Sequence, residues 1–183
     1  MGYNSKIYNV QRLASQLTYW GAFSMAQASY YLEHFYHVEH AADLIDNYCI
    51  NRQLCYLHGN KEIISISNFP YLTFSKGKEK CVWVYFSYID DAIKRGTKPN
   101  IITRNEFCGV DFTLWNRFYS LVYISEGDKT YFSILKTKHD EAKCYIFVVD
   151  SERRASQIKK LNSDDVIWIV SDGQIQLYSE GGA

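Results

Sequence analysis

Some acidic side chains of this sequence could bind Mg²⁺ in a nuclease active site. A metal-dependent nuclease of the restriction type needs an Asp and, on a neighbouring strand, an acid-x-Lys motif. Asp111 can supply the first carboxylate, and the expected second strand is YFSILK, residues 131–136. Ile134 occupies the place of the acid there, although Lys136 is present. A metal-dependent nuclease stays an alternative, and the sequence assigns no catalytic residue, no metal ligand and no cofactor.

A second candidate position lies in FVVDSERRASQIKK, residues 147–160. Asp150 and Ser151 fall where an apolar strand ends and a helix begins, which is where α/β folds often bind ligands. A helix N-terminus also attracts anions, and four Lys or Arg residues follow within this segment. The simpler interpretation is an N-cap followed by a solvated helix face.

Histidines recur at every third residue in the first quarter of the chain, at His34, His37 and His40. Together with Cys49 or Cys55 they could form a zinc site. Residues three and six apart do not converge on one face of a helix, and a second pair of ligands is missing. Surface histidines between two helices are therefore the preferred interpretation.

Apolar residues with helical spacing predict three helices before residue 53. Val10, Leu13, Ala14 and Leu17 should form the apolar face of the first, and Ser24 should cap the second. The third helix should cover residues 39–52.

After the third helix the hydrophobic period changes from that of a helix to that of a strand. Ile64 and Ile66 alternate with serines, residues 54–57 are apolar, and residues 58–61 can form the turn between two strands. Three helices followed by a hairpin is the order of a winged helix, a variant of the helix-turn-helix. We expect this domain to span residues 1–98.

Side chains that can contact DNA lie on the predicted third helix, on the hairpin and on the first helix. Asn can read adenine edges, Arg can read guanine, and cations can meet phosphates. Asp43 and Asp46 oppose phosphate on the same helix, and residues 1–98 hold ten Lys or Arg against eight Asp or Glu. Protein–protein contact or dimerisation without DNA is therefore the alternative. The residues predicted to contact DNA are Arg12, His40, Asn47, Asn51, Arg52 and Lys61.

The second half of the chain, residues 99–183, predicts a small α/β domain that follows the linker GTKPN at residues 96–100. A helix should begin at Ser151 and reach about Leu161. Asp172-Gly173 is a hairpin signal. Strands are predicted at residues 119–124, 130–135, 144–149, 166–170 and 175–178.

The segments QRLASQLTYWGAFSMAQASYYL and NRQLCYLHGNKEIISIS, followed by KCYIFVVDSERRASQI and VIWIVSDGQIQLY, carry a resemblance to a family. Over most of its length the chain resembles the replication-relaxation type proteins of plasmids and conjugative elements, and small relatives in Gram-positive mobile elements. The resemblance implies an α+β protein, in which a winged helix-turn-helix precedes a degenerate nuclease-like α/β domain. It implies non-catalytic handling of double-stranded DNA in replication, relaxation or transfer, with a homodimer or a relaxosome-type protein as a further partner.

Composition restricts the class of binding partner and the cellular compartment that we expect. A formal net charge of zero argues against a protein held to nucleic acid mainly by bulk positive charge. Five cysteines without C-x-x-C spacing are typical of reduced thiols in a cytoplasmic protein. No apolar run is long enough for a membrane span, so we expect no membrane partner.

Overall fold

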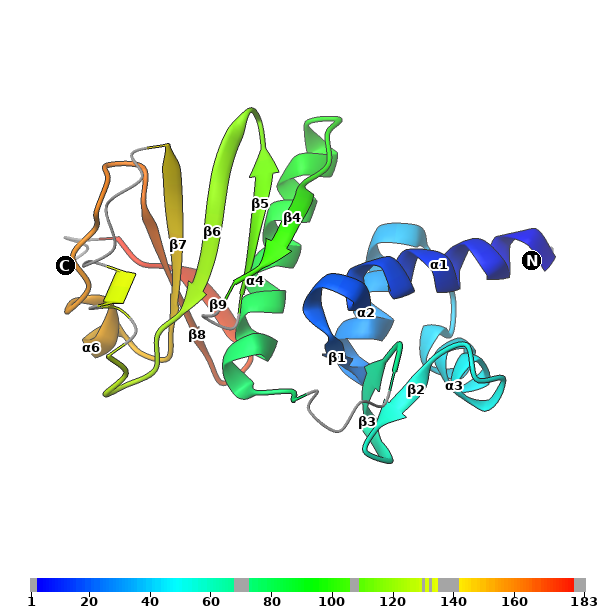
Figure 1. Cartoon of the computed structure of the whole chain (residues 1–183). Coiled ribbons are helices and arrows are strands. Elements are labelled where there is room, and N and C mark those ends of the chain that lie inside the picture. Colours follow the sequence, from blue (N-terminus) through cyan, green and yellow to red (C-terminus); the bar gives the residue numbers. More distant parts are fainter. Residues whose placement is uncertain are drawn as a thin grey trace. The chain divides into compact units, whose positions relative to one another are not determined.

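The computed structural model describes the backbone of residues 3–67, 73–105, 109–129, 131, 133–134 and 142–179, and side chains from residue 8 onward. The chain forms two compact units, Met1–Ser75 and Lys76–Ala183. The first holds helices and a three-stranded sheet, and the second holds a six-stranded sheet (Figure 1). An α+β fold, as predicted, is confirmed at this level.

In the first unit a short strand separates the first two helices, and a hairpin follows the third. The sheet is antiparallel with the order β1-β3-β2, so the last strand lies in the centre. Along the chain the elements are α1 (Tyr3–Trp20), β1 (Ala22–Ser24), α2 (Met25–Tyr36), α3 (Ala41–Ile50), β2 (Cys55–Leu57) and β3 (Asn60–Ser65).

The start of α2 follows from two side chains that satisfy backbone groups reciprocally. The backbone N–H of Gln27 donates to Ser24 Oγ at 3.2 Å, and the backbone N–H of Ser24 donates to Gln27 Oε1 at 3.1 Å. This capping box satisfies helix N–H groups that have no partner within the helix. The predicted N-cap is confirmed. On the predicted apolar face of α1, Val10, Leu13 and Leu17 are buried and Ala14 is half-buried.

A four-residue turn connects α2 to α3, with Val38 buried in its middle. His37 and His40 both have φ of 54°, outside the helical range, so α3 begins at Ala41 rather than at residue 39. Glu33 of α2 caps it from the neighbouring helix, because its Oε1 accepts the N–H of Ala41 at 3.2 Å. The left-handed Arg52, with φ of 58°, prevents the helix from reaching residue 52.

The predicted hairpin is confirmed, with a two-residue turn at His58-Gly59 where both φ values are positive. The predicted alternation is wrong at its end. Ser65 is buried and Ile66 is 42% exposed, because Ser65 donates its hydroxyl to the carbonyl oxygen of Gly21 at 2.7 Å. The strand stops at that inward-facing serine, and Ile66 lies beyond the paired region.

The second unit places a long helix before a mixed sheet with the strand order β4-β5-β6-β7-β8-β9. The pairs β6-β7 and β7-β8 are parallel, and the other pairs are antiparallel. The elements are α4 (Lys76–Lys94), β4 (Asn100–Arg104), β5 (Val110–Leu114), β6 (Arg117–Tyr123), β7 (Lys143–Val149), α6 (Glu152–Ala155), β8 (Val166–Ser171) and β9 (Gln174–Leu177).

Helix α4 packs on one face of this sheet through an aromatic cluster. The ring of Tyr88 lies 5.7 Å from that of Phe112, 5.9 Å from that of Tyr119 and 6.4 Å from that of Trp168. Nearer the start of α4, a Cβ on Gly77 would overlap the ring of Tyr123, so glycine permits the close approach of helix and strand. These contacts tie α4 to strands β5, β6 and β8.

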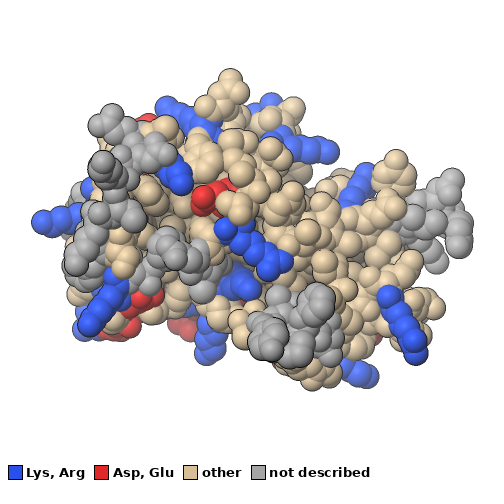
Figure 2. Space-filling model, viewed as in Figure 1, with Lys and Arg blue, Asp and Glu red and all other residues tan. Residues whose placement is uncertain are grey.

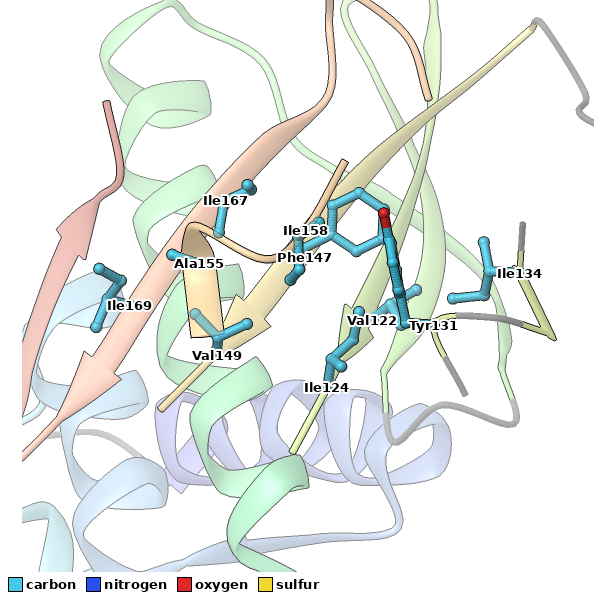
Figure 3. Packing of buried hydrophobic residues seen from close by; sticks show 10 residues of the cluster. All are labelled: Val122, Ile124, Tyr131, Ile134, Phe147, Val149, Ala155, Ile158, Ile167 and Ile169. Atoms are coloured by element: carbon cyan, nitrogen blue, oxygen red, sulfur yellow. The ribbon is translucent and has the colours of Figure 1, made fainter. Parts of the chain in front are cut away.

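The opposite face of the sheet is covered by the two segments that connect its parallel strands. Side chains from the β6–β7 connection and from α6 and its C-terminal extension close over strands β6, β7 and β8 (Figure 3). The sheet is therefore buried on both faces, which explains the continuous apolar sequence of β7. The cluster consists of Val122, Ile124, Tyr131, Ile134, Phe147, Val149, Ala155, Ile158, Ile167 and Ile169.

The division of the chain differs from the expected boundary at residue 98. Residues 76–98 contain the whole of helix α4 and belong with the sheet of the second unit, because α4 buries its aromatic side chains there. Residues 96–100, expected to form a linker, instead make the turn between α4 and β4, with Gly96 at φ of 69°. The aromatic packing, which no local pattern reveals, sets this division.

Two predicted elements of the second half are wrong. The strand expected at residues 130–135 is absent from the described residues there, because Tyr131, Ser133 and Ile134 are helical. The helix expected from Ser151 to Leu161 ends at Ala155. The predicted strands β6, β7, β8 and β9 are confirmed, whereas β4 and β5 were not anticipated.

Two serines of the first unit make a matched test of the capping box. Ser24→Ala should lower the free energy of unfolding by about 1 kcal/mol, because the backbone N–H of Gln27 at the start of the helix loses its acceptor, Ser24 Oγ. Ser29→Ala, within the same helix, should be neutral or stabilising by up to about 0.5 kcal/mol. The Ser29 hydroxyl is buried without a partner among the described residues. Urea unfolding monitored by circular dichroism measures both, and equal losses in the two variants would contradict this account.

Candidate nucleic-acid interface

Helix α3 and the hairpin that follows it carry most of the side chains predicted to contact DNA. The helix buries Ala41, Ile45 and Tyr48, so its opposite side faces solvent. Asn47 is exposed on that side, and Ile50 is 73% exposed. The exposed isoleucine was not anticipated, although its position outside the apolar stripe of the helix is visible in the sequence.

The carboxyl end of α3 has a defined cap. The side-chain amide of Asn51 donates to the carbonyl oxygen of Asn47 at 2.9 Å, and the N–H of Arg52 donates to that of Cys49 at 3.1 Å. Arg52 occupies the left-handed position where glycine is usual. The structure thus brings Asn47, Asn51 and Arg52 together at one end of the helix, with one Asn51 donor already used.

Lys61 lies at the other end of the hairpin. Cys55 pairs with Ser65 at the end nearest α3, and Leu57 pairs with Asn60 at the turn. Lys61 is exposed beside that turn, and Asn60 accepts the N–H of Glu62 at 2.9 Å. The lysine therefore lies at the turn of a short, hydrogen-bonded hairpin, separated from Arg52 by the length of the strands.

The other two residues predicted to contact DNA, Arg12 and His40, lie outside helix α3 and the hairpin. Arg12 is on α1, where its guanidinium lies 4.2 Å from the ring centroid of Tyr36 and 5.6 Å from that of Tyr8. This cation–π stacking orients the side chain along the end of α2. His40 is exposed in the turn before α3, and no side-chain hydrogen bond links it to the start of that helix.

The net charge of the first unit differs from the small positive excess that the sequence predicted for the first domain. Residues 1–75 hold four Lys or Arg and five Asp or Glu, whereas residues 76–98 alone hold six and three. The small positive excess expected for the first domain therefore came from helix α4. The first unit is slightly acidic, and its described cations are Arg12, Arg52 and Lys61.

An acidic side chain of α3 is tied to the hairpin. Tyr56 donates its hydroxyl to Asp46 Oδ1 at 2.6 Å, which joins α3 to β2. This hydrogen bond, with burial and the negative charge of Asp46, raises the pKa of Tyr56 to about 12. The carboxylate thus has a structural role, and it also keeps negative charge near the face of α3.

The histidines and cysteines of this region do not assemble a metal site. Among the residues that the structure describes, no three potential metal-binding side chains converge. The ring of His34 stacks on Tyr30 with centroids 4.7 Å apart. Burial, followed by the neighbouring Cys55 and Asp46, raises the pKa of the Cys49 thiol to about 11, so the thiol is protonated at neutral pH.

Asp111 of the second unit is held by hydrogen bonds within the sheet. It is buried on β5 opposite Ser120, and its Oδ1 accepts from Ser120 Oγ at 2.7 Å and from Asn105 Nδ2 at 3.2 Å. Lys143 Nζ lies 3.8 Å from Oδ2. The neighbouring strand β6 has Ser120-Leu121-Val122 beside Asp111, so it provides no acid-x-Lys motif.

The segment that should have carried this motif is different from the expectation. Ile134, at the acid position, is buried in a helical segment, and Lys136 lies outside the described residues. Asp111 is thus a carboxylate satisfied by neutral donors and a nearby lysine. It has no second carboxylate beside it on β6 with which to hold a divalent ion.

The carboxyl ends of the parallel strands hold a second polar cluster. Asp150 accepts a hydrogen bond from Tyr123 Oη at 2.6 Å and pairs with Lys80 of α4. Burial and then the nearby Lys76 lower the pKa of Lys80. Ser151 caps α6 by accepting the N–H of Arg154 at 3.2 Å, as predicted. The expected anion position is therefore filled by groups of the protein itself.

No protein family model, curated protein or solved structure matches this chain significantly. Among the described helices, none combines the length and apolarity that crossing a bilayer requires.

The left-handed Arg52 gives a test that separates backbone strain from charge. Arg52→Gly should unfold with a free energy about 1 kcal/mol higher than Arg52→Ala, because only glycine adopts a φ near 58° without a Cβ penalty. Both variants lose the same cation. Urea unfolding of the pair measures the difference, and identical midpoints and slopes would show that the cap is not strained.

Proposed function

We propose that the chain is a non-catalytic DNA-binding protein of the winged-helix type, which contacts double-stranded DNA through its first unit. The observation that supports this proposal is the order of elements in that unit. A helix and a short strand precede two helices joined by a four-residue turn, and a hairpin then places its second strand between the other two. That order is the one that presents a recognition helix and a wing.

The proposed contact uses the carboxyl half of α3. A helix with its side chains is about 10–12 Å across, which fits a major groove about 12 Å wide, and the ten residues of α3 make it about 15 Å long. Asp43 lies near the amino end and repels phosphate, so the other end, with Asn47, Asn51 and Arg52, meets the base edges. Lys61 on the hairpin turn then meets the sugar-phosphate backbone.

Charge sets the expected strength of this contact. Three described cations in the first unit allow about three phosphate contacts, so log K should fall with log salt with a slope no steeper than about −3. Non-specific binding should therefore be weak and best seen at low salt. The resemblance to replication-relaxation proteins makes replication, relaxation or transfer of a mobile element the proposed setting.

Lys61→Ala and Arg52→Gly should each weaken binding to a duplex of about 20 base pairs and reduce the salt slope by about 1. Arg52→Ala should weaken it equally, because the cation and not the backbone makes the contact. Fluorescence anisotropy at about 50 mM salt measures these effects. Lys160→Ala, an exposed lysine of the second unit, is the control. Unchanged duplex affinity in both the Lys61 and the Arg52 variants would remove this mechanism.

A protein–protein contact through α3 is the second candidate. Ile50 is the observation that favours it, because it leaves a large apolar side chain 73% exposed next to Asn47 and Asn51. Exposed apolar groups framed by polar ones are typical of protein interfaces. In this case α3 would bind a second copy of the chain instead of DNA.

Ile50→Ser should convert a dimer into a monomer if α3 forms a protein interface, because a central apolar contact is lost. Light scattering over a dilution series measures the mass. Ile66→Ser is the matched control, since Ile66 is also an exposed isoleucine of the first unit. A monomeric unsubstituted protein, or a dimer that survives Ile50→Ser, would contradict this candidate.

A further inference from the structure

The β5–β6 turn contains a tryptophan, a residue that turns of this type disfavour. Trp115 and Asn116 are its two central residues, with φ of 51° and 60°. A turn of this hand favours Gly, Asn or Asp, because only small residues accept positive φ easily. A tryptophan there is costly for the backbone, and its side chain is 37% exposed. A strained position that keeps a large exposed aromatic residue points to a function of that residue.

Arg95 holds the indole in place. Its guanidinium carbon lies 4.5 Å from the ring centroid of Trp115, in cation–π contact. Arg95 follows the last residue of α4, so the end of that helix and the turn of the hairpin form one surface. The side chain of Trp115 is thereby oriented while a large part of it stays accessible.

Positive charge gathers around this aromatic residue. Residues 92–105 contain four Lys or Arg and no Asp or Glu. Asn100 pairs with Thr113, so Lys98 lies two residues before β4, at the end of the β4–β5 ladder from which β5 leads into the Trp115 turn. Figure 2 shows Lys and Arg side chains along the side of the second unit where α4 ends and the β5–β6 hairpin turns.

Two of these cations have no carboxylate partner among the residues that the structure describes. Lys94 lies 3.9 Å from Asp91, and Arg117 binds Asp164 at 2.9 Å, which reduces their effect on an outside ligand. Arg95 and Lys98 have no such ion pair in the described part of the chain and are exposed. The surface therefore presents one oriented aromatic ring beside two available positive charges.

We propose that Trp115, Arg95 and Lys98 bind single-stranded nucleic acid, with an unpaired base stacked on the indole and the adjacent phosphates on the two cations. Aromatic platforms combined with basic side chains bind single strands with little sequence preference. In a duplex the bases are already stacked and cannot reach the ring. The proposal goes beyond duplex binding by the first unit and does not depend on it, because every residue involved belongs to the second unit.

A fluorescently labelled oligothymidylate of about 20 nucleotides is the probe. Trp115→Ala should weaken its binding at least about fivefold, whereas Trp115→Phe should keep affinity within about threefold. Both replacements keep the same positive-φ position, so their backbone cost is matched. Arg95→Ala and Lys98→Ala should each weaken binding and reduce the salt slope by about 0.7. Lys160→Ala, with its exposed lysine elsewhere in the second unit, should bind as the unsubstituted protein does.

Intrinsic fluorescence gives a second readout. The oligonucleotide should quench the emission of Trp115, because a base stacks on its ring. The other tryptophans should change less, because Trp20 is buried and Trp83 and Trp168 are half-buried. Trp115→Phe should retain binding and lose this quenching. Circular dichroism and thermal melting confirm that each variant is folded, so that lost binding is not lost structure.

Full oligothymidylate binding by folded Trp115→Ala would overturn the inference, and so would self-association that depends on Trp115 without any oligonucleotide binding. Loss of single-strand binding in Lys61→Ala but not in Trp115→Ala would also overturn it. Single-strand binding that depends on Trp115, in a protein without duplex binding, would support the inference while removing the proposed function of the first unit.

Discussion

Pairing of strand β3 on both of its edges is the constraint on which the first unit depends. Strand β1 lies between α1 and α2 in the chain, so its pairing with β3 fixes where those two helices meet the sheet. Strand β2 follows α3, so the hairpin fixes the end of that helix, and the hydrogen bond from Tyr56 to Asp46 adds a second attachment. The buried Ser65 hydroxyl, which donates to Gly21, joins the end of β3 to the residue that terminates α1. Three helices are thereby oriented by a sheet of very few residues.

The proposed winged helix of the first unit lacks the positive charge that usually accompanies a DNA-binding fold. The first unit has three helices followed by a hairpin, the order that the proposed winged helix requires, yet it carries one more acid than base. A cation that adjoins an exposed aromatic ring, and that has no carboxylate partner among the described residues, lies instead at the end of α4, where Arg95 stacks on Trp115 of the β5–β6 turn. If both proposals hold, the two units contribute different forms of recognition. One depends on shape and base edges, and the other depends on stacking and phosphate charge.

Local sequence signals predicted much of the fold and little of the candidate sites. Ser24 with Gln27, and Asp172 with Gly173, were readable because cap and turn chemistry depends on near neighbours. The strand expected at residues 130–135 was wrong, because Tyr131 and Ile134, whose types suit a strand, are helical and join the cluster that contains Phe147. Long-range packing also decided the division of the chain, since the partners of Tyr88 lie on strands more than twenty residues away. The left-handed cap at Arg52 depends on the sign of a backbone φ angle. The stacking of Arg95 on Trp115 depends on a tertiary contact. The spacing of residue types along the sequence predicts neither.

The ion pair at the carboxyl ends of the parallel strands has a consequence for how that edge of the sheet behaves. Asp150 already occupies Lys80 and the hydroxyl of Tyr123, so the protein supplies its own counter-ion at the place where an outside anion would bind. An incoming phosphate or carboxylate would have to displace a tethered competitor whose effective concentration is far above that of any solute. The ion pair between Asp150 and Lys80 therefore attaches α4 to this edge of the sheet, and it occupies the position where an outside anion would bind.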